Sequence, residues 1–474
     1  MMPVTPVPLS CIVDSLCERQ RTLMTTPLLL ILVAAVAFLA THVVYEWLAK
    51  RLLIVSGAEY LVLGVLLGPQ VTGLFTPAAI EAFQPIIILG IGWMGVAVAM
   101  PLRLQRLVRI PAVPYRTALV ESLLTFGVVT AGATSAIAYA YQVPWREVLA
   151  AGGILGAIAV ASTPAGLDVA FGERGKDAAR RAPVLLQIEV ANHLNAVVSV
   201  VVFGIILAVM HDTVPLMVRA LTTTEWVVVT LGIGVVGGTV FHLFLGGEQS
   251  ADRLVISLGG AIILASGAAA YLELSPTLAL FAMGVVLVNS MRNPGAVQDV
   301  LRAGERPLYY ALLLLAGASW RPDSNIGWWL VIMHYVVLRT LTKLWGTGIV
   351  TWVNGAQQSV GLDWGRALIG QGRLTIALAF DYSRRGLPYG DVIFTCAAVS
   401  VLFTEFFAAR FVRAAAAPLI APLESISATT GAVLDTVTET VTHALPSFLQ
   451  PSEDGSADRP ADVSEPKPAP PGDR

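Results

Sequence analysis

The sequence predicts an all-α polytopic membrane protein, and three observations lead to that fold class. Of the 474 residues, 55% are hydrophobic and only 13% are charged, which is about half the charged share of a typical soluble domain. The mean hydropathy is +0.72. The apolar residues also come in long unbroken runs, and a soluble protein of this size could not cover such a surface with polar groups. The lipid bilayer is therefore the expected surroundings of the chain.

The charged and sulphur-containing residues exclude several other classes of function. The 30 basic and 32 acidic residues nearly cancel, so no basic field suggests a nucleic-acid partner. The three cysteines have no CxxC spacing, which argues against a metal knuckle or a disulfide scaffold. HExxH and GxSxG motifs are absent from the sequence, which argues against an intramembrane hydrolase. We expect no enzymatic activity, no cofactor and no resident metal.

About 13 apolar runs are expected to cross the membrane, because a spanning helix needs about 20 mostly apolar residues. The ninth and tenth runs are shorter than the others. The expected spans are residues 27–48, 53–75, 83–101, 115–140, 147–171, 184–210, 224–246, 253–272, 275–291, 306–320, 325–351, 364–383 and 389–413.

Lys and Arg side chains gather in the loops on one side of these spans. Most of them follow the odd-numbered spans, as Arg103, Arg106 and Arg109 do after the third. Loops rich in Lys and Arg stay in the cytoplasm. We therefore expect a multi-pass protein of the cytoplasmic membrane, with its N-terminus outside and its C-terminus in the cytoplasm.

Composition divides the chain into four regions. Residues 1–25 form an N-terminal extramembrane segment, and residues 26–413 form the transmembrane domain. Residues 414–450 are predicted to hold an amphipathic cytoplasmic helix, because apolar side chains recur there at helical spacing. Residues 451–474 are acidic, rich in proline and almost free of apolar side chains, so we expect them to be disordered.

Two of the expected spans are interrupted by helix-breaking residues. The fifth contains Ser162-Thr163-Pro164-Ala165-Gly166, and the twelfth contains Gly370-Gln371-Gly372-Arg373. Interrupted helices at matching positions of two halves are typical of transporter binding sites. The two spans are seven helices apart, so their orientations are opposite, and spans 1–6 and 8–13 would be inverted six-helix repeats. Two unrelated helix kinks are the alternative explanation.

Six segments, taken in order, resemble the monovalent cation:proton antiporter superfamily, which has the sodium/proton exchanger fold. The resemblance extends over about residues 26–413, and the order and spacing of the segments carry it. The segments are GAEYLVLGVLLGP (57–69), ASTPAG (161–166), SPTLALFAMGVVLVNS (275–290), LLLLAGASW (312–320), LRTLTKLWGT (338–347) and GQGRLTIALAF (370–380).

This resemblance implies a fold and a function. Members of the superfamily exchange a monovalent cation for protons by moving a core domain against a dimerisation domain. The implied core consists of spans 4–6 and 11–13, with the two discontinuous helices crossing at the transport site. A homodimer is also implied.

The chain departs from the family pattern at the transport site. Asn192-His193 stands where the family has an Asp-Asp or Asn-Asp pair, and Gln371-Gly372-Arg373 stands where it has Arg-Gly-Glu. Because imidazole can take up a proton near neutral pH, His193 is our candidate proton carrier. Asn192 and the break at Thr163-Pro164 are expected to line the site. Alternatively, His193 forms a structural pair with Glu189, four residues earlier on the same helix face.

The remaining ionisable residues within the spans are functional candidates, because a charge inside the membrane is costly. Lys343 matches the lysine of the family, and we expect it to support the crossing of the helices. Glu121 is expected to be another polar partner in the core. Arg373 is expected to pair with Glu189. Asp168 is the alternative carboxylate for the site, although it could equally lie at the cytoplasmic mouth.

The functional prediction is a secondary active transporter, a monovalent cation (Na⁺ or K⁺):proton antiporter that works by alternating access. The alternative is a transport-silent membrane protein of the same fold with a sensing or assembly role. His193 in place of the aspartate favours this alternative, whereas Lys343 and the two helix breaks favour transport.

Overall fold

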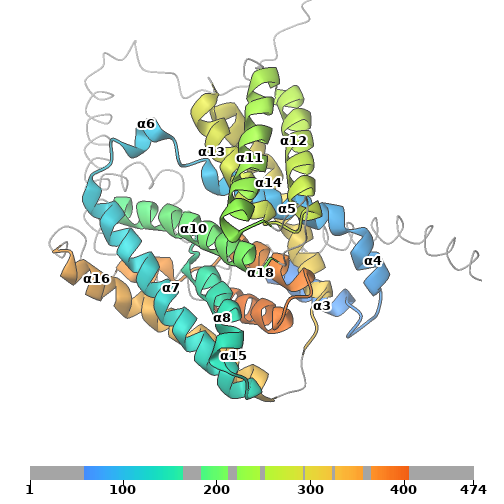
Figure 1. Cartoon of the computed structure of the whole chain (residues 1–474), viewed down its shortest axis with the longest axis vertical. Helices are drawn as coiled ribbons and strands as arrows, with labels where there is room; N and C mark the ends of the chain where they lie inside the picture. Colours follow the sequence, from blue (N-terminus) through green and yellow to red (C-terminus); the bar gives the residue numbers. More distant parts are fainter. Residues whose placement is uncertain are drawn as a thin grey trace, which may run out of the picture. The chain divides into compact units, whose positions relative to one another are not determined.

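The computed structural model describes residues 58–163, 183–211, 221–245, 251–291, 294–322, 326–355 and 364–404 (Figure 1). All of them belong to Met1–Pro418, the first of two units into which the chain divides. Within these ranges the regular secondary structure is helical throughout, without a strand. The predicted all-α class is thereby confirmed, whereas the predicted first span and the regions 1–25, 414–450 and 451–474 lie outside the described residues.

The helices form two packed groups. The first group, which we call the scaffold group, consists of α3 (Ala58–Leu67), α5 (Gln84–Ala99), α11 (Thr223–Leu245), α12 (Ala251–Tyr271), α13 (Pro276–Ser290) and α14 (Pro294–Ala318). The second, the core group, consists of α7 (Ala112–Tyr141), α8 (Trp145–Val160), α10 (Pro183–Met210), α15 (Ile326–Leu341), the π-helical turn η2 (Thr342–Gly346), α16 (Thr347–Val353), the 3-10 helix η3 (Trp364–Leu368) and α18 (Arg373–Arg384). The helix Gly390–Thr404 joins this group, because Phe394 contacts Phe380 of α18 and Thr404 accepts a hydrogen bond from the backbone of Gln371. Two short helices, α4 (Pro77–Ala82) and α6 (Leu104–Leu107), lie in connecting segments.

The main packing between the two groups comes from two helices of the core group. Helix α10 packs against α5, α11 and α13, and α18 packs against α5 and α14. Within each group the packing is closer, as between α7 and α8 (Figure 1) or between α5 and α13. The described part of the chain therefore consists of two helix groups, and α10 and α18 of the core group make the main contacts between them.

The lengths of the helices support the predicted membrane spans. Four described helices are long and apolar enough to cross a membrane, and three more are apolar but shorter. The long ones are Ala112–Tyr141, Val184–Met210, Thr223–Phe244 and Arg253–Tyr271, and the shorter ones are Gln84–Ala99, Pro276–Ser290 and Gly390–Thr404.

The tenth span differs from its prediction, because α14 begins at Pro294 and not near residue 306. Its first half is amphipathic: Val297, Val300 and Leu301 are buried in the scaffold core, while Arg302 is exposed. Hydropathy alone misses such a half-apolar segment, although its helical spacing lets it pack.

The described parts of the two predicted helix breaks touch, although the fifth span beyond Thr163 lies outside the described residues. Helix α8 ends at Val160, and residues 161–163 continue without helical structure. Residues 369–372 separate η3 from α18 in the same way. The backbone N–H of Thr163 donates to the carbonyl oxygen of Gly370 over 3.1 Å. A Cβ atom at Gly372 would lie only 2.9 Å from Cβ of Thr163, so glycine permits this approach. The end of α8 and the interruption before α18 therefore meet, as the predicted crossing requires.

Candidate functional site

A buried arginine on α15 connects the two breaks. The guanidinium of Arg339 donates to the carbonyl oxygens of Ala159 (3.2 Å), Ala161 (3.2 Å) and Ile369 (2.8 Å). Carbonyl groups at the end of a helix have no partner within the helix, and a cation satisfies them well. Arg339 is therefore the side chain that holds both interruptions together, a role that our sequence analysis did not assign to it.

One turn further along, Lys343 lies in the π-helical turn η2 and is fully buried. Its Nζ donates to Oε1 of Glu121 over 2.8 Å and to the carbonyl oxygen of Val160 over 3.1 Å. The hydroxyl of Thr125 donates to the same Glu121 oxygen over 2.8 Å. The structure thus brings two of the sequence candidates, Lys343 and Glu121, together in an ion pair at the end of α8.

A cavity of about 320 Å³ opens at the crossing of the breaks. We call it the break cavity. Both interruptions line it, together with α10, the end of α5 and the first half of α14. Its polar and charged lining residues are Ser162, Thr163, Asn192, His193, Gln298, Arg302, Glu305, Arg373 and Thr375.

Two of the lining side chains are buried and lack a hydrogen-bond partner within the described part of the chain. Both polar atoms of the Asn192 amide and the hydroxyl of Thr375 are in this state, with side chains exposed by 1% and 0%. By contrast, the amide of Asn195 donates to Ser162 over 3.1 Å. Because buried polar groups are nearly always paired, Asn192 and Thr375 are candidate ligand groups.

His193 lies at the edge of the break cavity. Its Nε2 is 3.9 Å from Oε1 of Glu189, with the two side chains exposed by 35% and 48%. An ion pair with this exposure contributes little to stability. The structure therefore contains the intrahelical pair of the alternative explanation, and it also leaves His193 within reach of the cavity.

The expected pairing of Arg373 with Glu189 is wrong. Arg373, the first residue of α18, forms its ion pair with Glu305 of α14, and its guanidinium also lies over the ring of Tyr309 at 5.8 Å. The error has a physical source. The tenth span was expected to begin after Glu305, in which case this carboxylate would lie in a loop, whereas the amphipathic start of α14 carries it to the cavity.

The two other sequence candidates, Pro164 and Asp168, lie outside the described residues. Their positions relative to the break cavity remain predictions.

A second buried charge cluster lies at the opposite end of α18, and sequence reasoning did not identify it. The fully buried carboxylate of Asp381 accepts hydrogen bonds from Arg384 (2.7 Å) and Arg385 (3.1 Å). Arg385 also donates to the carbonyl oxygens of Glu273 (2.6 Å) and Leu274 (2.8 Å) in the scaffold group. Both ends of α18 therefore contact the scaffold group through an arginine.

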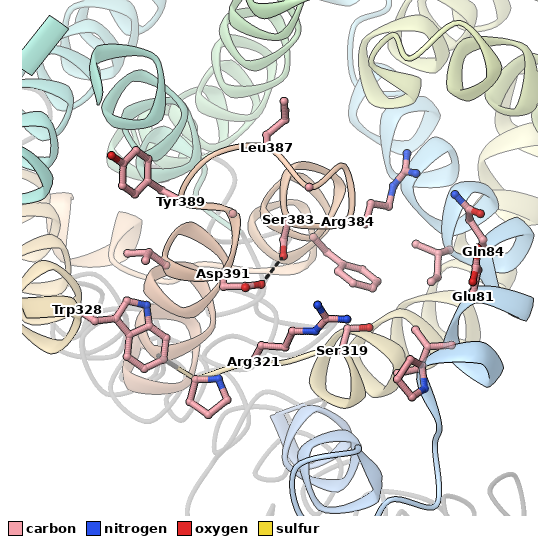
Figure 2. A pocket seen from close by; sticks show the side chains of 18 of the residues that line it. Glu81, Gln84, Ser319, Arg321, Trp328, Ser383, Arg384, Leu387, Tyr389 and Asp391 are labelled. Atoms are coloured by element: carbon pink, nitrogen blue, oxygen red, sulfur yellow. Dashed lines mark hydrogen bonds between the residues drawn. The ribbon is translucent and has the colours of Figure 1, made fainter. Parts of the chain in front are cut away.

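A larger cavity of about 800 Å³ lies beside this second cluster, and Figure 2 shows its lining. Arg321 and Arg384 line it from different segments of the chain. The hydroxyl of Ser383 donates to the carboxylate of Asp391 over 3.4 Å. Helices α5 and α18 each line the break cavity at one end and this second cavity at the other. The 12 residues of α18 correspond to about 18 Å of helix, and its buried middle separates the two cavities.

A sequence profile described as "Sodium/hydrogen exchanger, transmembrane" matches residues 114–415. The chain belongs to this family. The matched range contains both helix breaks, α10 and the Lys343–Glu121 pair. The exchanger is accordingly a multi-pass membrane protein whose family carries out ion transport by antiport.

One solved structure resembles the exchanger in fold. The sodium proton antiporter MjNhaP1 from Methanocaldococcus jannaschii at pH 8 matches with a TM-score of 0.57 and 16% identity, over 83% of this chain and 98% of that one. An electron-microscopy structure of the same antiporter matches with a TM-score of 0.49 and 16% identity, over 85% and 97% of the two chains. A search of curated proteins finds no match.

Proposed function

We propose that the exchanger moves a monovalent cation, Na⁺ or K⁺, against protons by alternating access, with the break cavity as the transport site. The observation that carries this proposal is the unpartnered, buried amide of Asn192 beside His193, in a cavity where both helix interruptions meet. Broken helices that meet within the membrane are typical of cation sites in transporters. The resemblance in fold to MjNhaP1, a sodium proton antiporter, also supports this proposal.

The backbone carbonyls nearest the crossing are already occupied. Arg339 takes those of Ala159, Ala161 and Ile369, and Lys343 takes that of Val160. These four oxygens are therefore poor ligands for a cation, and we propose that side chains of the break cavity contribute ligands. Asn192 is the first candidate ligand, since its amide oxygen is buried and unpartnered.

His193 supplies the coupling to protons in this mechanism. The family resemblance implies an aspartate that couples the two ions, and we propose that His193 stands in its place. A protonated imidazole and a cation about 6 Å apart repel each other by about 3 kcal/mol at an effective dielectric constant of about 20. Protonation of His193 would therefore expel the cation, and loss of the proton would admit it, without any ligand that both ions share.

Three features support alternating access. The core and scaffold groups meet mainly through α10 and α18. Cavities lie at both ends of α18. The arginine contacts at those ends, Arg373 with Glu305 and Arg385 with two carbonyls, join the core group to the scaffold group. We propose that these contacts break and form in turn as the core group moves.

The distribution of basic residues supports an orientation for this state. Arg103, Arg106 and Arg302 lie near the end of α5 and the start of α14, where the break cavity opens. Since basic loops stay in the cytoplasm, we propose that the break cavity faces the cytoplasm and that both termini have the predicted sides. We also propose the homodimer implied by the family, which cross-linking of the exchanger in membranes would test.

One observation favours the second candidate function, a transport-silent protein with a sensing or assembly role. Among the described residues that line the break cavity, the one carboxylate is Glu305, and it is paired with Arg373. A site without a free carboxylate attracts a cation only weakly.

A flux assay separates the two functions. Purified exchanger in vesicles with a preset pH gradient should dissipate the gradient when sodium or potassium is added outside. A flat trace with every alkali cation, from protein shown to be folded, would establish the silent alternative.

The role of His193 needs its own variants. We expect His193→Gln to abolish exchange and His193→Asp to retain it, because aspartate can also carry a proton. His334→Gln is the matched control, since His334 is exposed on α15 and does not line the break cavity. Unchanged exchange in His193→Gln would exclude this histidine as the carrier and move attention to Asp168.

A further inference from the structure

Among the residues that the structure describes, the oxygen atoms available in the break cavity are neutral, and neutral oxygens favour some cations over others. The described lining contains amide and hydroxyl side chains, and its one carboxylate, Glu305, is held by Arg373. From this chemistry we infer that the exchanger selects potassium over sodium. The inference rests on the proposed function, because it names the cation that the same site would carry.

Asn192 and Thr375 provide the ligand groups on which the inference depends. They come from two different elements, α10 and the first turn of α18, and both line the break cavity. Their oxygens are buried and have no partner among the described residues. The backbone N–H of Thr375 already donates to Gly372 over 3.1 Å, so its hydroxyl is the group left for a ligand. Neither the sequence nor the family resemblance gives Thr375 a role.

The strength of these ligands decides between the two cations. A smaller ion holds its water shell more tightly, and ligands of high field strength, such as carboxylates, replace that shell better than neutral oxygens do. Amide and hydroxyl oxygens replace the looser shell of a larger ion, as carbonyl oxygens do for K⁺ in channels. A cavity whose available oxygens are all neutral therefore disfavours Na⁺ and Li⁺ relative to K⁺ and Rb⁺.

The cationic side chains around the crossing strengthen this preference. Arg339 and Lys343 neutralise the negative end of α8 and bind four backbone carbonyls. Lys343 in turn occupies one oxygen of Glu121. The carboxylates of Glu121 and Glu305 are thus each paired with a cationic side chain, Glu121 with Lys343 and Glu305 with Arg373.

The test is the cation dependence of exchange in vesicles, with KCl, RbCl, NaCl, LiCl and choline chloride added in turn to the full-length protein. We expect half-saturating concentrations for K⁺ and Rb⁺ to be lower than those for Na⁺ and Li⁺ by about tenfold or more. Equal or better exchange with Na⁺ would overturn the inference and leave the proposed function intact. No response to any cation would overturn both. Dissipation of the pH gradient by choline chloride would also overturn the inference, because the transported ion would then be chloride.

Variants connect the selectivity to the named residues. Thr375→Val, which keeps the shape and removes the hydroxyl, should raise the half-saturating concentration for K⁺ about tenfold. Asn192→Asp should shift the preference towards Na⁺, because it adds a carboxylate. Thr239→Val is the matched control, since Thr239 is exposed on α11 and its hydroxyl donates to the carbonyl oxygen of Val235 in its own helix. An unchanged K⁺ response in Thr375→Val would contradict the assignment.

Ligand binding can also be measured without transport. KCl, but not NaCl at equal ionic strength, should raise the melting temperature of the wild-type exchanger in detergent. The same rise with both salts would argue against a potassium-selective site.

Discussion

Replacing Lys343 by methionine should leave the carboxylate of Glu121 buried without its opposite charge. The two side chains are exposed by 0% and 1%, and their charged atoms are 2.8 Å apart. The second oxygen of Glu121 has no partner within the described residues. Water is therefore unable to take over the role of the lysine in the native structure.

The magnitude follows from this burial. Removing one partner of a buried ion pair costs about 3–5 kcal/mol of the free energy of unfolding, because an uncompensated charge remains. Glu121→Met should cost a similar amount. The double variant removes both charges, so it should lose only about 1–2 kcal/mol, chiefly from the unpaired carbonyl of Val160 and hydroxyl of Thr125.

The assay is a double-mutant cycle. Unfolding of the wild type and the three variants in mixed detergent micelles, followed by circular dichroism, gives the coupling energy, which should exceed about 3 kcal/mol. Glu147→Met is the control, because Glu147 is exposed in the first turn of α8. Additive losses in the double variant, or a Lys343→Met variant as stable as the wild type, would refute the reasoning.

Two other predictions concern the crossing itself. Arg339→Lys should impair folding and exchange almost as strongly as Arg339→Leu, because an ammonium group lacks the fork with which the guanidinium reaches three carbonyls. Thermal melting and vesicle flux measure the two effects. A lysine variant that folds and exchanges like the wild type would contradict this prediction. Gly372→Ala should slow exchange about tenfold or more, since a Cβ there would lie 2.9 Å from a side-chain carbon across the crossing. Gly127→Ala is its control, with no atom within 4 Å of the added carbon, and equal rates in the two variants would refute the steric argument.

The helices and their breaks could be predicted from the sequence because the membrane imposes their length. Runs of about 20 apolar residues mark spanning helices, and proline and glycine within two of those runs mark the interruptions. Lys343 and Glu121 were recognisable because a charge within an apolar run is costly. That they pair with each other follows only from the packing of α7 against η2.

Other site residues gave weaker signals. Arg339 precedes Lys343 by four residues, so helical spacing could have placed both on one face. Glu305 lies in the amphipathic half of α14, which a count of apolar residues assigns to a loop. Thr375 carries no sequence signal, since threonine is common in membrane helices, and only its lack of a partner in the structure distinguishes it.

The π-helical turn η2 affects more than Lys343. Tyr335, Arg339, Lys343, Thr347 and Thr351 follow one another at intervals of four, and all are buried. In an ordinary α-helix each such interval drifts by about 40° around the axis, so the last of the five would point away from the first by almost half a revolution. A wider turn of about 4.4 residues reverses part of this drift and lets Thr351 still accept a hydrogen bond from Trp364. When this helix is superposed on an uninterrupted helix of a relative, equivalent positions beyond Gly346 should therefore be offset by one residue.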